Sequence, residues 1–280
     1  MHKTRKAISS VLLVIVSLVW LSPIYIILTN SFKSRAEMYA NPIALPKSFS
    51  LGYYIDAMQR LDFITAFKNS LILTIVSVGL LVILCAMASW MLARSNGKLS
   101  KLIYAVLILT MLIPFQTLMM PLMQEMQGIT KLTGLHMKDS LGGLIFMYLG
   151  FGAGMGIFLG YGFVKGSLPR SLEEAATIDG CNPFQTFWNV VFPILKPTAI
   201  TVAILNTMWI WNDYLLPYLV IGSDYKTIPI AIQYLKGGYG SIDMGAMMAM
   251  LVLAIIPVVV FYLTSQKYII KGVAAGAVKG

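Results

Sequence analysis

Six long apolar segments that are almost free of charge constrain this chain more than any other feature. A helix needs about 20 apolar residues to cross the hydrocarbon core of a bilayer. Among the 21 Lys+Arg and 11 Asp+Glu residues, only Asp213 lies inside one of these segments. The separation predicts an all-α, polytopic membrane protein with six transmembrane helices. The predicted spans are 7–30, 69–93, 102–124, 140–164, 197–222 and 244–266.

The composition excludes two other classes of protein. Hydrophobic residues make up 58% of the chain and charged residues 11%, whereas soluble proteins carry about 25% charged residues. Disordered chains need low hydrophobicity and high charge, so that class is excluded too. The net charge of +10 is spread over several connecting segments rather than gathered in one stripe. It therefore favours basic membrane loops over nucleic-acid binding.

The basic residues also predict an orientation. Lys3, Arg5 and Lys6 precede the first span, which is long and lacks a clean cleavage site, so we interpret it as an uncleaved anchor. With the N-terminus inside, the inner segments carry more Lys and Arg than the outer ones, and most acidic residues lie outside. We therefore expect both termini to be cytoplasmic.

The inner segment 165–196 is long for a connection and has its own helix signals. Ser171 and Glu174 have the spacing of a capping box, in which the serine caps the helix and the glutamate reaches back. Gly180 is suited to the residue just after a helix end. We expect a short helix that begins at Ser171 and a turn at Gly180.

A second helix is expected directly after that turn. Asn182 and Pro183 are typical of a helix start, with proline at the first position. Pro193 and Pro197 are expected to end this helix and lead into the fifth span. Taken alone, the resulting hairpin is explained equally well as a capped connector that shields the bundle.

The residues of this hairpin carry a more specific pattern. It resembles the EAA signature of importer permeases of the ATP-binding cassette (ABC) class, in which a glycine and then Ile-x-Leu-Pro follow at fixed spacing. Val190 and Phe192 stand where that pattern has Ile and Leu. The matching residues are Glu174, Ala175, Ala176, Asp179, Gly180, Val190, Phe192 and Pro193.

Further matches extend from about residue 8 to residue 280. The chain is similar to MalG-like permease subunits of carbohydrate ABC importers, and the end of the chain is the most specific match. The matching residues are Phe67, Asn69, Ser70, Leu71, Thr74, Ile113, Pro114, Pro121, Trp211, Asn212, Thr227, Pro229, Gln266–Tyr268 and Gly272–Gly280.

This resemblance implies a type I ABC importer permease fold and a non-catalytic transport subunit for a di- or oligosaccharide in the bacterial cytoplasmic membrane. The implied partners are a second, MalF-like permease, two ABC ATPase subunits and an extracytoplasmic sugar-binding protein. No cofactor is implied for this chain, because ATP and Mg²⁺ are used by the ATPase. The resemblance also implies three parts, namely 1–66, a permease core at 67–271 that contains the loop, and a tail at 272–280.

The same resemblance assigns the candidate coupling residues. The loop helix would dock in a cleft of one ATPase, and the tail would reach between the two ATPases. A frayed chain end is the alternative for the tail. The coupling candidates are Glu174, Ala175, Ala176, Asp179, Gly180, Gly276, Lys279 and Gly280.

Polar and aromatic residues in the second and fifth spans are candidates for a sugar path. Intramembrane carboxylates are often functional, and aromatic rings and amides suit the C–H faces and hydroxyls of sugars. An aromatic belt at the interface, or hydrogen bonds between helices, explains them equally well. The candidates are Asn69, Asn206, Trp209, Trp211, Asn212 and Asp213.

Other motifs favour packing over chemistry. Small residues at every fourth position of the fourth span, and a methionine stripe on the third, are typical of helix contacts. Cys85 and Cys181 lack metal or redox spacing, so neither site is expected. The packing motifs are Gly152, Gly156 and Gly160, and Met119, Met123 and Met126.

Three alternatives remain for the function. An ABC importer of a polyol phosphate or another small solute would use the same motifs. An ion-coupled secondary transporter would show internal repeats and acids at mid-bilayer, and a repeat of the six spans is not evident. A membrane enzyme would need clustered catalytic groups, and His2 and His136 have no such neighbours in the sequence.

Overall fold

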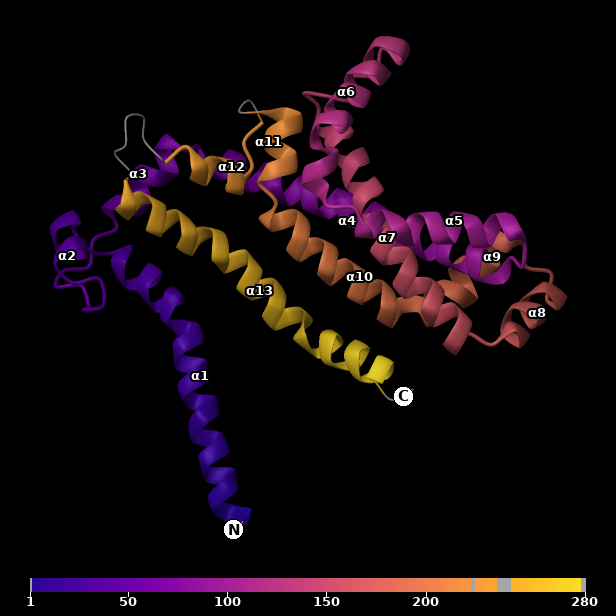
Figure 1. The fold of residues 1–280 in the computed structure, drawn as a ribbon, viewed down its shortest axis with the longest axis horizontal. Helices are drawn as coiled ribbons and strands as arrows, with labels where there is room; N and C mark the ends of the chain where they lie inside the picture. Colours follow the sequence, from indigo (N-terminus) through magenta and orange to yellow (C-terminus); the bar gives the residue numbers. More distant parts are fainter. Residues whose placement is uncertain (1, 223–224, 236–242, 278–280) are drawn as a thin grey trace. The chain divides into compact units, whose positions relative to one another are not determined.

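The computed structural model describes residues 2–222, 225–235 and 243–277, and every regular element within these ranges is a helix (Figure 1). The chain divides into two compact units. One unit comprises Met1–Ala66 and Ile230–Val260, and the other comprises Phe67–Pro229 and Phe261–Gly280.

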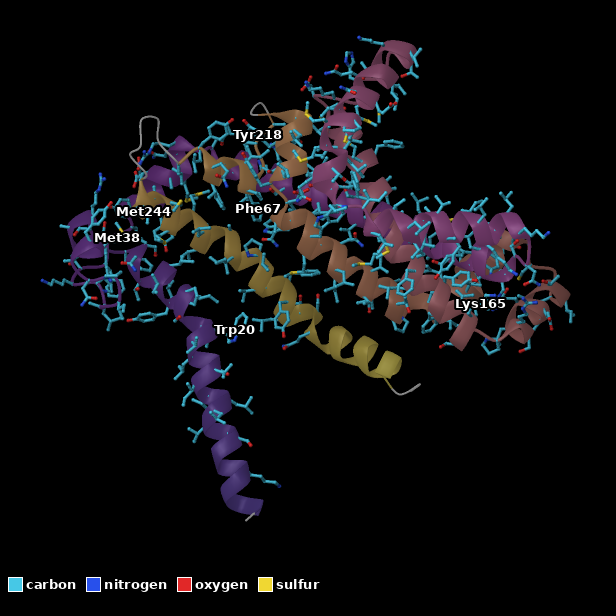
Figure 2. The ribbon with its side chains drawn as sticks, viewed as in Figure 1. Trp20, Met38, Phe67, Lys165, Tyr218 and Met244 are labelled. Atoms are coloured by element: carbon cyan, nitrogen blue, oxygen red, sulfur yellow. The ribbon has the colours of Figure 1, made fainter. Side chains whose placement is uncertain are left out.

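The first unit contains α1 (His2–Asn30), α2 (Arg35–Ala40), α3 (Gly52–Arg60) and the first part of α13 (Met244–Ala277). An apolar groove of about 220 Å³ lies between α1 and α13. The side chain of Ser34 caps α2 and Glu37 reciprocates, which forms a capping box. The apolar side chains of α1 are exposed, as is typical of a helix that faces lipid. Trp20, for example, is 77% exposed and projects from the ribbon in Figure 2.

The second unit holds most of the remaining helices around one apolar core. Buried core residues include Leu73 and Leu81 of α4, Leu144 and Tyr148 of α7, and Leu216 of α11. The division between the two units falls within α12, and the end of α13 belongs to the second unit. The helices are α4 (Phe63–Arg94), α5 (Lys98–Leu109), η1 (Thr110–Leu112), α6 (Phe115–Thr133), α7 (Leu141–Ser167), α8 (Arg170–Ile178), α9 (Pro183–Thr186), η2 (Phe187–Val191), α10 (Phe192–Asn212), α11 (Leu215–Ile221) and α12 (Ile228–Gln233).

Helices long and apolar enough to cross a membrane match the predicted spans closely. Four predicted spans, the first, second, fourth and sixth, are confirmed as single helices, and the sixth begins at Met244 as predicted. The remaining helix of this kind, Pro183–Asn212, overlaps the fifth predicted span but begins and ends earlier in the chain. The five helices are Ser9–Asn30, Phe63–Arg94, Leu141–Ser167, Pro183–Asn212 and Met244–Gln266.

The third predicted span, 102–124, is not one continuous helix, so that prediction was wrong in this respect. Lys98–Leu112 and Phe115–Thr133 meet at an angle of 112°. Ile113 is extended, with φ −88° and ψ 119°, a conformation that Pro114 favours because its ring crowds the helical conformation of the preceding residue. Pro121, by contrast, lies inside α6 without ending it.

The bounds of the fifth span also differ from the prediction. Pro193 and Pro197 do not end the second loop helix, because η2 is a π-helical turn that joins α9 to α10, and Phe192 N donates to Phe187 O across five residues. The wider turn shifts the hydrogen-bond register where proline has no N–H to donate. One helical run therefore extends from the loop to Asn212. It stops at the extended Asp213, which precedes α11.

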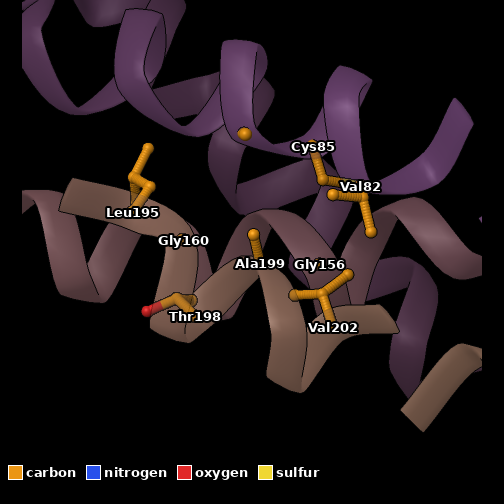
Figure 3. A pocket seen from close by; sticks show the side chains of 9 residues that line it. Val82, Cys85, Gly156, Gly160, Leu195, Thr198, Ala199 and Val202 are labelled. Carbon is orange, nitrogen blue, oxygen red and sulfur yellow. The ribbon is translucent and has the colours of Figure 1, made fainter. Parts of the chain in front are cut away.

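Gly152, Gly156 and Gly160 of α7 lie at close helix contacts, as predicted. A Cβ on Gly152 would lie 2.7 Å from Leu81 Cδ1, and one on Gly156 would lie 2.6 Å from Cys85 Sγ, so only glycine lets α4 approach this closely. Residues of α4, α7 and α10 meet here, as Figure 3 shows. The gap that they line has a volume of about 10 Å³, which is too small for a sugar ring. On α6, Met126 is buried and Met123 packs beside it, which confirms the packing role of that stripe.

Candidate functional site

The inner loop forms a helix, a turn and a second helix, as predicted, but its first helix starts differently. The N-cap of α8 is Pro169, and no side chain caps this end, so the predicted capping box of Ser171 and Glu174 was wrong. Both residues already lie within the helix, which begins at Arg170. Ser171 does not act as the N-cap because the extended residue that precedes the helix is Pro169.

The turn at Gly180 is confirmed and has a defined geometry. Gly180 has φ +82°, a left-handed conformation that glycine adopts without steric cost. Cys181 N donates to Ala176 O at 2.9 Å, and Gly180 N donates to Thr177 O at 3.1 Å. These two bonds make a Schellman motif, which satisfies the last carbonyls of α8. Asp179 is the C-cap residue.

The second loop helix begins as predicted. Asn182 is the N-cap of α9, and Pro183 occupies the first turn. Asn182 Oδ1 accepts from Gln185 N at 2.9 Å, while Gln185 Oε1 accepts from Asn182 N at 2.9 Å. This reciprocal capping box fixes the direction in which the chain leaves the Gly180 turn.

The outer face of the hairpin combines charge with apolar side chains. Glu174, Ala175 and Asp179 are exposed, whereas Ala176 is buried against the rest of the loop. Ile178 is 85% exposed and Phe184 is 64% exposed, one on each side of the turn. An exposed apolar pair on a capped hairpin is typical of a surface that contacts another protein.

An aromatic cluster supports this hairpin from the membrane side. Phe187 and Val191 of η2 are fully buried together with Val164 and Leu168, which lie at the end of α7 and just after it. Trp90 of α4 packs against the same cluster. The second half of the loop is therefore continuous with the apolar core of the α4–α7–α10 bundle.

A polar clamp joins the first half of the loop to α4. Arg94 Nε and Nη2 donate to Glu173 Oε1 at 2.8 and 2.5 Å, and Trp90 Nε1 donates to Glu173 Oε2 at 3.0 Å. Arg94 Nη2 also donates to Leu168 O at 2.7 Å. The side chains of Arg94 and Glu173 are only 18% and 16% exposed.

The sequence interpretation missed this clamp. It singled out neither Glu173 nor Arg94. The spacing of Trp90 and Arg94, one helical turn apart at the inner end of a span, was an available signal. Their partner Glu173 lies 79 residues from Arg94 in the chain, so its identity required the fold.

The tail candidates fall mostly beyond the described residues. Gly276 belongs to α13, which continues to Ala277. Lys279 and Gly280 lie outside the described residues.

Three of the sugar-path candidates are buried and have partners within the chain. Asn69 Nδ2 donates to Lys226 O at 2.9 Å, and Asn206 Nδ2 donates to Val202 O at 2.9 Å. Trp211 is 7% exposed, with its ring edge against the ring of Phe67. Asn69 and Trp211 therefore link separate parts of the chain, whereas the bond of Asn206 lies within α10.

The other three candidates lie at the end of α10. Trp209 and Asn212 are exposed on the face of α10 that also carries Leu205 and Met208. Asp213 is half-buried at the helix break, where its Oδ2 accepts from Tyr148 Oη at 2.9 Å and its Oδ1 accepts from Leu215 N at 3.0 Å. Asp213 therefore lies at the C-cap of α10, between α10 and α11, rather than inside a helix, which corrects its predicted place within a continuous span.

Groups that could hold a metal ion or form a disulfide are absent from the described part of the chain. No three His, Cys, Asp or Glu side chains there come together. Cys85 is buried and Cys181 is half-buried, and both are free thiols.

Comparison with known proteins agrees with this architecture. A bacterial ABC transporter involved in the import of the acidic polysaccharide alginate has a chain with a TM-score of 0.79 over 95% of this chain and 96% of that chain. At 24% identity this likeness shows the fold. A second alginate transporter structure, in complex with a pentasaccharide-bound periplasmic protein, gives 0.70 at 14% identity, with 94% of each chain covered.

Similar sequences come from curated bacterial permeases. The probable starch degradation products transport system permease protein AmyC of Thermoanaerobacterium thermosulfurigenes is 45% identical over 98% of this chain and 97% of its own length. The multiple sugar-binding transport system permease protein MsmG of Streptococcus mutans is 34% identical, with 96% and 95% covered. The melibiose/raffinose/stachyose import permease protein MelC of Bacillus subtilis is 32% identical, with 98% and 96% covered.

The family match spans most of the helices described above. Residues 83–275 match the family described as the binding-protein-dependent transport system inner membrane component, a range that includes the inner loop and both of its helices. The chain therefore belongs to this family of inner-membrane transport permeases.

Proposed function

We propose that this chain is one of two permease subunits of an ATP-driven importer for a di- or oligosaccharide. The observation that carries the proposal is the capped, aromatic-supported hairpin at Arg170–Val191, in a chain that is 45% identical to a starch-product permease. The chain contributes the membrane path and no catalysis. ATP and Mg²⁺ are bound and used by partner ATPase subunits.

The hairpin is proposed to receive the push of the ATPase. A helix with a closed Schellman end moves as a rigid body, whereas an irregular loop absorbs displacement. Glu174, Ala175 and Asp179 present the docking face, and Gly180 makes the turn that brings α9 alongside. ATP can bias such a two-state path only if the ATPase binds the two loop positions with different affinity. For the tail, we propose that Gly276, Lys279 and Gly280 reach toward the ATPases.

The exposed face of α10 is proposed to complete the path with a second permease. Leu205, Met208, Trp209 and Asn212 recur at helical spacing, so they form one continuous face. Trp209 supplies an aromatic ring and Asn212 an amide, which together match the apolar and hydroxyl faces of a sugar. Asp213 is proposed to position this end of α10 through its bond to Tyr148.

The proposed setting is the bacterial cytoplasmic membrane with both termini inside. This orientation places the hairpin on the ATP side and the segment between α1 and α4 on the side of the binding protein. The basic residues before α1 and after α4 support it through the positive-inside rule.

Copurification and transport test the proposal. The chain is co-expressed and purified with its partner permease and ATPase. The complex is then placed in proteoliposomes, and a sugar-binding protein and labelled maltotriose or raffinose are added. We expect uptake that requires both ATP and the binding protein, and no ATPase activity from the permeases alone. Uptake driven by an ion gradient without ATP would contradict the proposal and favour a secondary transporter.

A further inference from the structure

The clamp of Arg94, Trp90 and Glu173 joins two elements that the proposed function requires to move together. Four hydrogen bonds run between the last turns of α4 and the start of α8, including the bond from Arg94 to the carbonyl of Leu168. Both donor side chains belong to α4, at positions four residues apart, so they lie on one face of that helix.

Apart from the clamp, α8 contacts mainly α9 and η2 in the second half of the loop. Ala176 is its single buried residue, and its N-cap Pro169 makes no side-chain bond. The turn at Gly180 links α8 to α9, but a turn restrains only that end. The orientation of the first half of α8 therefore depends on the carboxylate of Glu173, which is fixed by the planar fork of Arg94.

The anchor on α4 leads directly into the tight helix contacts of the bundle. Ser89, the residue directly before Trp90 in α4, is fully buried, and its Oγ donates to Ile157 O of α7 at 3.3 Å. Close packing of this kind transmits displacement rather than absorbing it. A push on α8 thus has a continuous route through Arg94 into α4 and from there into α7.

We infer that Arg94 is a positioning residue that transmits movement of the coupling helix α8 to the transmembrane helix α4. This inference rests on the proposed function. The clamp differs from the docking face, because Glu173 points into the chain whereas Glu174 is exposed. Loss of the clamp should leave the ATPase docked and the path intact but uncouple one from the other.

The test measures ATPase activity of the whole complex in proteoliposomes against increasing maltotriose-loaded binding protein. For Arg94→Gln we expect the maximal stimulated rate to fall about tenfold, as for loss of a strongly coupled pair. The unstimulated rate and the half-saturating concentration of binding protein should stay unchanged. Glu173→Gln should behave alike. Lys98→Gln, an equal loss of charge at an exposed site just beyond α4, is the matched control and should match the unsubstituted complex.

The reversed pair, Arg94→Glu with Glu173→Arg, tests whether the ion pair itself, rather than the size of the side chains, is responsible for the coupling. It should regain about half of the lost rate, because the ion pair reforms while the bonds to Trp90 and Leu168 do not. A reversed pair as slow as Arg94→Gln would contradict the inference.

Two further outcomes would overturn it. Stimulation of Arg94→Gln equal to that of Lys98→Gln would show that the clamp transmits nothing. Failure of both Arg94→Gln and Glu173→Gln to assemble would make the clamp an assembly contact instead. An unsubstituted complex that is not stimulated by any sugar-loaded binding protein would refute the proposed function, which is a different result.

Discussion

The contact between α4 and α7 allows a prediction in which the same substitution has opposite effects along one helix. An alanine at Gly156 would place its Cβ 2.6 Å from Cys85 Sγ and 2.9 Å from Cys85 Cβ. The sulfur can rotate, but the Cβ is fixed to the backbone of α4, so the helices must separate. At Gly150 and Gly162 of the same helix, an added Cβ meets nothing within 4 Å.

The magnitude follows from the difference between these sites. Replacing glycine by alanine inside a helix gains about 1 kcal/mol of helix propensity at all three positions, so this gain cancels in the comparison. What remains is the overpacking at Gly156, which costs about 1–3 kcal/mol. In a chain of this size that cost lowers the melting temperature by about 2–4 °C for each kcal/mol.

The assay heats the detergent-solubilised complex and measures the fraction that stays monodisperse in size-exclusion chromatography. Gly156→Ala should melt several degrees below both Gly150→Ala and Gly162→Ala. If the three variants melt together, the close approach of α4 and α7 at Cys85 is refuted, and with it the rigid route from the loop into the bundle.

Three further predictions concern the turn, the ion pair of the first unit and the two tryptophans of α10. Gly180→Ala should destabilise the complex by about 1 kcal/mol and Gly180→Asn by less, because asparagine tolerates the left-handed conformation better; equal melting temperatures would contradict the Schellman turn. Burial opposes ionisation of Asp243, but the hydrogen bonds from Arg60 and Ala246 outweigh it and lower the pKa of Asp243 below the usual 3.8. The contribution of Asp243 to stability is therefore present above the ordinary pKa and is lost as the pH falls through the pKa of the folded state. The melting difference between the unsubstituted complex and Asp243→Asn, which retains a capping side chain, should therefore shrink below about pH 4, and a difference that does not depend on pH would refute the pair. Trp209→Ala should reduce sugar uptake with normal assembly, whereas Trp211→Ala should cost about 3 kcal/mol of stability. A loss of stability in Trp209→Ala together with normal stability of Trp211→Ala would contradict the exposed position of Trp209 and the buried position of Trp211.

The spans that the sequence predicted well are those whose boundaries coincide with charge. Charged residues cannot enter the hydrocarbon core cheaply, so the gap between Arg94 and the preceding charge marks the second span with no knowledge of its neighbours. The Gly180 turn and the Asn182 cap were predictable for a similar reason, because their signals depend on residues only a few positions apart.

Features that depend on backbone register were not predictable from the same signals. A proline inside an apolar segment is compatible with a helix that continues, as at Pro121, and with a break, as at Pro114. The π turn before Pro193 depends on how Phe187 packs against α4 and α7, which is information from distant parts of the chain. The partner of Arg94 was not predictable for the same reason, because Glu173 is distant from it in the sequence.

The candidate site residues were likewise predictable only in part. The sequence selected residues by type, and the fold separates them by exposure. Asn69 bonds the distant carbonyl of Lys226. Asn206 and Asn212 each bond a carbonyl of α10 itself, but Asn206 is buried and Asn212 is exposed. Residue type alone does not distinguish an amide that links elements from one that faces a partner.

The central claim is that the exposed face of α8 couples ATP hydrolysis to sugar uptake, and Glu174→Lys in the reconstituted complex tests it most directly. Sugar-stimulated ATPase activity and ATP-driven uptake of labelled maltotriose are measured together, with Glu125→Lys as a control for the same change of charge at an exposed residue of α6. The account predicts that Glu174→Lys loses both activities while Glu125→Lys retains them. Retention of both activities by Glu174→Lys would contradict it.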